Sequence, residues 1–161
     1  RGRMELAATK KNGATVYVDY AHTPDAIEVA LKSLKPHILG KLIVVIGAGG
    51  ERDEGKRPLM GTAAEQNSDF VIITDDNPRN EDPSVIHQMI KNGIQNDNKV
   101  KVIADRAEAI LKAVDLLEVG DGLLIAGKGH ETEQVIGENN FPFDDFEQAS
   151  LSVASLDGIE Q

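Results

Sequence analysis

Short apolar runs alternate with amphipathic segments along most of this chain. The runs are ATVYVDYA (14–21), KLIVVI (41–46), FVIIT (70–74), KVKVI (99–103) and GLLIA (122–126). They are rich in β-branched residues, and most are almost continuously apolar, which is typical of parallel strands that are buried on both faces. The pattern therefore predicts the strands of a parallel sheet.

Segments with helical periodicity follow these runs. Thr23 and Pro24 have the character of an N-cap and a first helical residue. Apolar residues recur at helical spacing in three segments: Ile27, Ala30, Leu31 and Leu34; Ile86, Met89, Ile90 and Ile94 after Asp82 and Pro83; and Ile110, Ala113, Val114 and Leu117 after Asp105, which we interpret as a helix cap. Residues 55–67 and 145–156 predict two further helices.

Strands and helices that alternate through short loops indicate an α/β fold. We predict a doubly wound, mostly parallel sheet of five to six strands, Rossmann-like in class, with helices on both faces and an antiparallel strand near Phe141. Residues 1–161 have the length of a single domain. Because the chain opens RGRMEL without a starting Met, we expect a fragment of a larger protein, cut near a domain boundary.

Composition narrows the possible functions. The net charge of -10 argues against nonspecific binding to nucleic acid or to an anionic membrane. No apolar run approaches the ~20 residues of a membrane span. The absence of cysteine excludes disulfides, thiolate metal sites and a cysteine nucleophile. This composition suits a reducing cytoplasm, where we expect the protein to act as a monomer.

The segment from Gly50 to Lys56 matches G-x-x-x-x-G-K, the front of a phosphate-binding P-loop. The next residue is Arg57, not the Ser or Thr that would hold Mg²⁺, and three acids in the loop would repel phosphate oxygens. The dinucleotide fingerprint G-x-G-x-x-G also fails, because Arg52 replaces its last glycine. We interpret the match as a false positive, Arg52 as a candidate for binding another anion, and Lys56 and Arg57 as the solvated first turn of a helix.

The unusual polar residues follow the predicted strands. They are Asp19 and His22 in DYAHTP, Arg52 in GAGGERDEGK, Asp75, Asp76, Asn77 and Arg79 in TDDNPRNE, and Lys128, His130 and Glu131 in AGKGHETEQ. Open α/β sheets bind ligands at the carboxyl ends of their strands, so loops that converge there predict a binding site.

Each loop also has a simpler interpretation. Asp19 and His22 could satisfy backbone groups before a helix, Asn77-Pro78 is a turn signal, Arg79 could be a solvated charge, GKG a flexible turn, and His130 a histidine satisfied within its loop.

Five motifs taken together resemble the C-terminal domain of the Mur ligase family. GRMEL, VDYAHTPDA, GAGGERDEGKRPLMG, TDDNPRNEDP and AGKGHETEQ occur in that family in this order and are most similar to its MurE branch. The resemblance runs from Gly2 to about Ala154. It implies a cytoplasmic ligase of peptidoglycan synthesis that uses ATP and Mg²⁺ to join an amino acid to a UDP-MurNAc-peptide. The N-terminal domain and the central ATPase domain, with the true P-loop, would lie outside this chain.

The resemblance also implies a site for the amino acid. It assigns meso-diaminopimelate to the DNPR motif, Asp76, Asn77, Pro78 and Arg79, together with Arg52, Gly127 and Glu131. The chemistry agrees, because meso-diaminopimelate carries a far-end carboxylate that L-lysine lacks, and a guanidinium can hold a carboxylate through two parallel hydrogen bonds. Lysine-adding members of the family typically lack this arginine, and Glu131 suits the ammonium group of the ligand.

On the nucleotide side, the resemblance assigns Arg3 to the ATP phosphates, and Asp19 and His22 to the region of the ribose and adenine. It implies no catalytic residue and no metal ligand in this domain. The acyl phosphate would form on UDP-MurNAc-L-Ala-D-Glu at the central domain, and the amine of the amino acid would attack it. Lys128 and His130 receive no role, and we expect the isolated domain to be inactive.

Other functions remain open at this point. One is a non-catalytic module that binds an amino acid or a nucleotide, and another is a dinucleotide-binding oxidoreductase domain, against which the failed glycine fingerprint argues. A ligase of the same fold that adds L-lysine or builds folate polyglutamate is a further alternative. The DNPR and GKGHE motifs together weigh against the folate enzyme.

Overall fold

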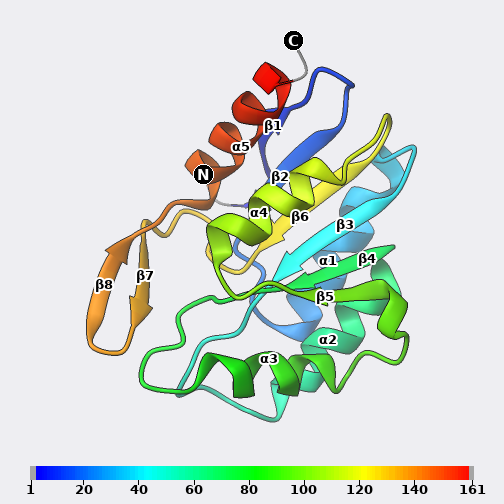
Figure 1. Cartoon of the computed structure of the whole chain (residues 1–161). Helices are drawn as coiled ribbons and strands as arrows, with labels where there is room; N and C mark the ends of the chain where they lie inside the picture. Colours follow the sequence, from blue (N-terminus) through cyan, green and yellow to red (C-terminus); the bar gives the residue numbers. More distant parts are fainter. Residues whose placement is uncertain (1–2, 160–161) are drawn as a thin grey trace.

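A six-stranded sheet forms the centre of the molecule, with the strand order β1-β2-β6-β3-β4-β5 (Figure 1). The computed structural model describes residues 3–159. The strands of this sheet are β1 (Glu5–Thr9), β2 (Thr15–Asp19), β3 (Leu42–Ile46), β4 (Phe70–Ile73), β5 (Val100–Val102) and β6 (Gly122–Ala126). β1 is antiparallel to β2, and all other neighbours are parallel, which confirms the predicted doubly wound α/β class.

Three of the five helices in the described part of the chain begin directly after the capping residues expected from the sequence. The helices are α1 (Pro24–Leu34), α2 (Lys56–Asn67), α3 (Pro83–Lys91), α4 (Arg106–Asp115) and α5 (Asp145–Ile159), with short 3₁₀ turns η1 (Lys35–His37) and η2 (Asp97–Lys99). Thr23, Asp82 and Asp105 each accept a backbone N–H from the first turn of their helix. Such caps typically contribute about 1 kcal/mol each, because they satisfy donors that the helix leaves free.

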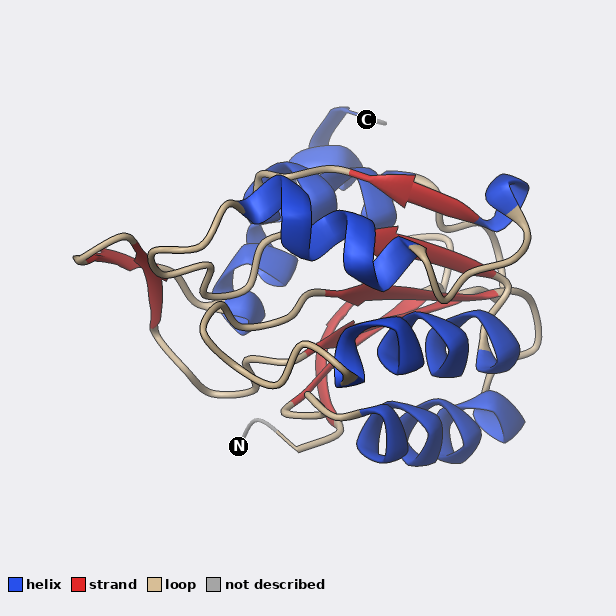
Figure 2. Ribbon diagram, turned by 90° about the horizontal axis from the view of Figure 1, so that it is seen from below, coloured by secondary structure: helices blue, strands red, loops and turns tan. Residues whose placement is uncertain are grey.

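Helices cover both faces of the sheet, which gives the protein two apolar cores (Figure 2). Every residue of β3 is buried, and successive side chains along the strand point alternately into one core and the other. Leu42, Val44 and Ile46 pack in the core that includes α1, α2 and α3, whereas Ile43 and Val45 pack in the core that includes α4 and α5. Burial on both faces explains why this strand is a continuous apolar run in the sequence.

The antiparallel strand expected near Phe141 is not part of the main sheet, so this prediction was wrong in its placement. Phe141 lies in a separate hairpin formed by β7 (Glu133–Ile136) and β8 (Asn139–Pro142), which projects away from the sheet (Figure 1). The antiparallel strand is β1, which the sequence analysis missed. Its segment ELAAT carries little β-propensity, and its strand character comes from the pairing with β2.

The strand order brings together the loops that carry the sequence motifs. β2, β6, β3 and β4 are consecutive neighbours and parallel, so the loops that follow them all leave the same edge of the sheet. These are the loops that carry DYAHTP, GKGHE, GAGGERDEGK and DDNPR. Among residues 3–159, we find no helix with the length and apolar character needed to cross a membrane.

A buried ion pair joins the sheet to α5 at this edge. The guanidinium of Arg106, at the start of α4, donates to Asp145 from Nε at 2.8 Å and from Nη2 at 2.7 Å. The same guanidinium donates to the carbonyl oxygens of Asp75 and Ala126, which follow β4 and end β6. Both partners of the pair are 0% exposed. Burial lowers the pKa of Arg106, but the charge and the hydrogen bonds of Asp145, together with the charges of Asp76 and Glu131, hold the pKa above its ordinary value.

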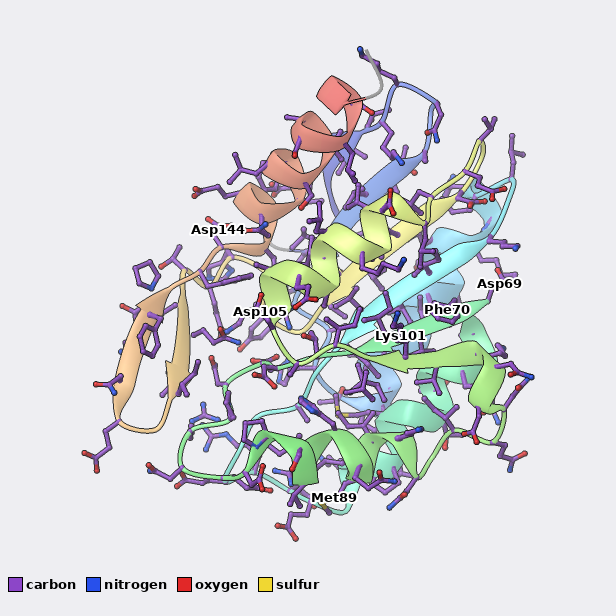
Figure 3. The ribbon with its side chains drawn as sticks, viewed as in Figure 1. Asp69, Phe70, Met89, Lys101, Asp105 and Asp144 are labelled. Atoms are coloured by element: carbon purple, nitrogen blue, oxygen red, sulfur yellow. The ribbon has the colours of Figure 1, made fainter. Side chains whose placement is uncertain are left out.

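Replacing Asp145 with Ala should lower the free energy of unfolding by about 3–5 kcal/mol, because it leaves the Arg106 guanidinium buried without its counter-charge. Urea denaturation measures this change. The control is Asp105→Ala, which removes the cap of α4 and should cost only about 1 kcal/mol. Figure 3 labels Asp105 at the start of α4 and Asp144, the residue before Asp145, at the start of α5. Equal costs in the two variants would contradict the importance given to the buried pair.

Candidate functional site

A pocket of about 370 Å³ opens where these loops meet. Residues from four loops and the start of α2 line it: Tyr20, His22 and Thr23; Gly47, Ala48, Gly49, Arg52 and Asp53, followed by Lys56, Arg57 and Met60 of α2; Asp76, Asn77 and Arg79; and Gly127 and Glu131. The structure thus brings together six of the seven residues predicted for the amino acid, and adds His22 from the predicted nucleotide site. Pro78, the seventh, is buried and does not line the pocket.

The DNPR loop and the glycine-rich loop lie unusually close to each other. The N–H of Gly50 donates to the carbonyl oxygen of Asn77 at 2.8 Å. A Cβ atom on Gly50 would lie 1.9 Å from the carbonyl oxygen of Pro78. Gly127 has φ of +115°, and a Cβ there would lie 2.7 Å from Oδ2 of Asp76. At Gly50 a side chain would collide with the backbone of the DNPR loop, and at Gly127 the positive φ strains any residue other than glycine, so both positions favour glycine.

The same contacts explain why the P-loop match is misleading. A phosphate cradle needs backbone N–H groups that are free to face the ligand. Here the Gly50 N–H is used by the DNPR loop, the N–H of Glu51 donates to Oε1 of Glu81, and that of Gly55 donates to Oδ1 of Asp53. The glycines thus serve loop packing, which supports the interpretation of the motif as a false positive.

Arg79 is held by its backbone and leaves part of its guanidinium available. It has a left-handed φ of 53°, its N–H donates to the carbonyl of Val135, and its carbonyl accepts from Gly137 in the hairpin. Nη1 donates to the carbonyl oxygen of Gly50 at 2.9 Å. Within residues 3–159, Nε and Nη2 have no hydrogen-bond partner among the contacts of Arg79. The half-buried side chain can therefore bind an anion in the pocket.

Lys128, for which the sequence suggested no role, lies fully buried against the pocket wall. Its Nζ donates to Oδ1 of Asn77 at 2.8 Å and to the carbonyl oxygen of Glu133 at 2.9 Å. It also lies 3.6 Å from a carboxylate oxygen of Asp76 and 3.8 Å from one of Glu131. Burial lowers the pKa of Lys128, and the two carboxylates oppose this shift because they favour the charged ammonium.

The prediction of a solvated first helical turn is confirmed for Lys56, which is exposed, and wrong for Arg57, which is 1% exposed. Arg57 forms a two-pronged ion pair with Glu81, with Nη2 2.9 Å from Oε1, and also donates to the carbonyl oxygen of Gly49. The hydrogen bonds from Arg57 and from a backbone N–H lower the pKa of Glu81 to about 2. Sequence analysis missed this pair because Glu81 lies in a different loop.

His87 is a second buried polar residue that the sequence analysis did not single out. Its Nε2 lies 2.6 Å from Oδ1 of Asp75, directly before the DNPR motif. His87 is 7% exposed and lies beside the buried Ile86 on α3. The partly buried Met89 of the same helix is labelled in Figure 3. The place of His87 among the apolar residues of the helix was a signal that could have revealed it.

The residues predicted for the nucleotide lie at the same edge of the sheet. Some of their polar atoms already have hydrogen-bond partners within the chain, and others are exposed. Both oxygens of Asp19 accept backbone N–H groups, from Met4 at 2.7 Å and from Ala21 at 2.8 Å. The simpler interpretation of Asp19 as a backbone-satisfying residue therefore holds at least in part. The bond to Met4 also brings the exposed Arg3 to this edge of the sheet. Gly2, the first residue of the motif around Arg3, lies outside the described residues.

His22 is exposed and lines the pocket. Its Nδ1 lies 2.8 Å from the carbonyl oxygen of Tyr20, which can only accept, so Nδ1 carries a proton and Nε2 is left as the second polar atom of the ring. The rings of His22 and His130 lie 4.6 Å and 6.3 Å from the ring of Tyr20. In the described part of the chain, no group of three or more His, Asp or Glu side chains is arranged to hold a metal ion.

Comparisons with known proteins identify the family. The family profile described as "Mur ligase, glutamate ligase domain" matches residues 2–129. The chain is 50% identical over 157 residues to UDP-N-acetylmuramoyl-L-alanyl-D-glutamate–2,6-diaminopimelate ligase of Agrobacterium fabrum, covering 98% of the chain and 32% of that protein. It is 52% identical over 152 residues to the ligase of the same name from Coxiella burnetii, covering 94% of the chain and 31% of that protein.

A solved structure of a protein with this name agrees with the sequence relatives. It superimposes with a TM-score of 0.91 at 42% identity, and the match covers 97% of this chain and 32% of the other. The chain thus spans about a third of the length of the curated relatives it matches. A profile match over most of the chain, together with identities near one half, is sufficient to assign the family. The chain belongs to the Mur ligase family.

Proposed function

We propose that this chain is the amino-acid-binding domain of an ATP-dependent ligase that adds meso-diaminopimelate to UDP-MurNAc-L-Ala-D-Glu in peptidoglycan synthesis. The observation that carries the proposal is one pocket in which Arg52, Asn77, Arg79, Gly127 and Glu131 come together from three loops. The names of the relatives that are about half identical to the chain support the same substrate. The protein acts in the cytoplasm, where its nucleotide-linked substrate is found.

The charges of the pocket match those of meso-diaminopimelate. This amino acid has two ammonium and two carboxylate groups, so its binding site needs cations and carboxylates in close array. Arg52 and Arg79 supply guanidinium groups for carboxylates, and Glu131 and Asp76 supply negative charge for ammonium groups. A ligand with an ammonium but no carboxylate at its far end, such as L-lysine, would leave Arg79 unpaired.

The role of the domain in catalysis is to position the amino acid. The attacking amine belongs to the ligand, so the domain needs no nucleophile of its own. Binding the amine in a fixed orientation beside the acyl phosphate makes the reaction effectively unimolecular, which can contribute several kcal/mol to lowering the barrier.

The residues of this chain fit part of an ATP site. Nε2 of His22 and the exposed guanidinium of Arg3 are available to a nucleotide. Each carboxylate oxygen of Asp19 already accepts one backbone N–H, so a nucleotide would have to share these oxygens. Bound ATP would supply the phosphoryl group that activates the acceptor carboxylate. The described residues offer no set of ligands for Mg²⁺, so in this proposal the ion is held outside them.

Replacing Arg79 with Ala should weaken meso-diaminopimelate binding by about ten- to a hundredfold, the usual range for the loss of a charge-assisted hydrogen bond. The affinity for L-lysine should fall much less, because lysine has no carboxylate at that end. Titration of the ¹⁵N-labelled chain measures both affinities. The control is Lys101→Ala, which removes an exposed cation from β5 outside the pocket (Figure 3). Equal losses for the two ligands would contradict the proposed specificity.

The isolated chain should form no amide bond when it is supplied with ATP, Mg²⁺, UDP-MurNAc-L-Ala-D-Glu and meso-diaminopimelate. The reason is that its described residues hold no metal site and its P-loop match provides no phosphate cradle. Phosphate release and mass spectrometry of the nucleotide sugar test this outcome, with the full-length Coxiella burnetii relative as positive control. Ligated product from the chain alone would show that the proposed division of labour is incorrect.

A further inference from the structure

Lys128 is one of two lysines that the described part of the chain buries almost completely. It is 0% exposed, and Lys10 is 4% exposed. Nζ of Lys10 donates to the carbonyl oxygens of Val114 and Leu117. These contacts lie at the edge of the sheet opposite to the pocket. Lys128, in contrast, donates to a side chain that lines the pocket, Asn77. Burial of an ammonium is costly unless each donor finds a partner, so these bonds determine where the surrounding groups lie.

The contacts of Asn77 fix the orientation of its amide. One amide atom lies 2.8 Å from Nζ of Lys128 and 2.9 Å from the backbone nitrogen of Val135. Both of these groups can only donate, so the amide atom that faces them is the oxygen, Oδ1. A flipped amide would place two hydrogens against two donors. The assignment therefore follows from the chemistry of the neighbours and needs no observation of hydrogens.

In this orientation, the NH₂ group of Asn77 is the part of its side chain that is left to bind a ligand in the pocket. Within residues 3–159, Nδ2 has no hydrogen-bond partner among the contacts of Asn77. Asn77 lines the same pocket as Arg79, whose Nε and Nη2 are also without partners there. Two side chains from one loop thus present only donors to the ligand. A carboxylate satisfies such a pair, and an ammonium does not.

We propose that Lys128 is a positioning residue that selects for a carboxylate: it holds Oδ1 of Asn77 and so turns the amide donors of Asn77 into the pocket beside Arg79. The carbonyl of Glu133 accepts a second bond from the same ammonium, and this ties the hairpin to the arrangement. The inference rests on the proposed function, because the carboxylate is that of the bound amino acid. Its first step, the orientation of Asn77 by Lys128, is independent of any ligand.

The first experiment compares Lys128→Met with Lys10→Met. Each variant removes one buried ammonium and keeps an unbranched apolar side chain, so both should lower stability. Only Lys128→Met should shift the ¹H–¹⁵N signals of the Asn77 side-chain amide and weaken meso-diaminopimelate binding by about tenfold or more. Unchanged Asn77 amide signals in folded Lys128→Met would overturn the inference, and so would an equal loss of affinity in Lys10→Met.

The second experiment uses Asn77→Asp, which keeps the acceptor oxygen for Lys128 and Val135 and replaces the NH₂ group with oxygen. This variant should fold, because both bonds that hold Asn77 are preserved. Its side-chain amide signals disappear, which identifies them in the spectrum of the unmodified chain. Binding of meso-diaminopimelate should fall by about ten- to a hundredfold, while that of L-lysine should hold or rise.

Asn98→Asp is the matched control for this charge change. Asn98 is exposed in η2, outside the pocket, and the substitution should leave both affinities as they are. Parallel losses for the two ligands in Asn77→Asp would contradict carboxylate selection. If the unmodified chain binds neither amino acid, the proposed function fails for this chain and the ligand step of the inference fails with it. The amide signals of Lys128→Met then still decide whether Lys128 orients Asn77.

Discussion

The Arg106–Asp145 pair is the interaction on which the functional edge depends. One buried guanidinium joins the carbonyl that follows β4, the carbonyl that ends β6 and the first residue of α5. These elements belong to distant parts of the chain, and their loops carry the DNPR and GKGHE motifs. Because an unpaired charge at this depth is very unfavourable, the two strand ends and the helix must form together. The geometry of the pocket is therefore coupled to the docking of α5, which contributes no residue to its lining.

Contacts between the loops themselves also shape the pocket. The pocket wall consists of loops that hold one another through backbone groups, and Gly50 and Gly127 allow contacts that a side chain would prevent. Lys128 and Arg57 are buried cations that bind these loops to one another, each through carboxylates and carbonyl oxygens. These buried polar groups thus help to fix the positions of the residues that line the pocket.

Much of this arrangement could be predicted from the sequence. β3 and β6 are buried on both faces, so their residues form apolar runs, and the caps Thr23, Asp82 and Asp105 mark their helices. The motifs located the pocket because neighbouring parallel strands end at one edge. β1 could not be predicted, since its character depends on pairing with β2. The burial of Arg57 and Lys128 also escaped prediction, because the groups that satisfy them lie in other loops and no local pattern records such contacts.

The hairpin has a consequence for attempts to transfer specificity between relatives. The N–H of Arg79 donates to Val135 in β7, its carbonyl accepts from Gly137 directly after β7, and Oδ1 of Asn77 also accepts from Val135. The DNPR motif is therefore bonded along the hairpin, with one isolated β-bridge between Arg79 and Ile136. The motif and its partner strand are separated by more than fifty residues in the chain. A graft of the four motif residues alone would leave behind the hairpin to which they are bonded. Under the proposed function, a transfer of specificity requires the motif together with Lys128 and the hairpin, two segments that must be exchanged as a pair.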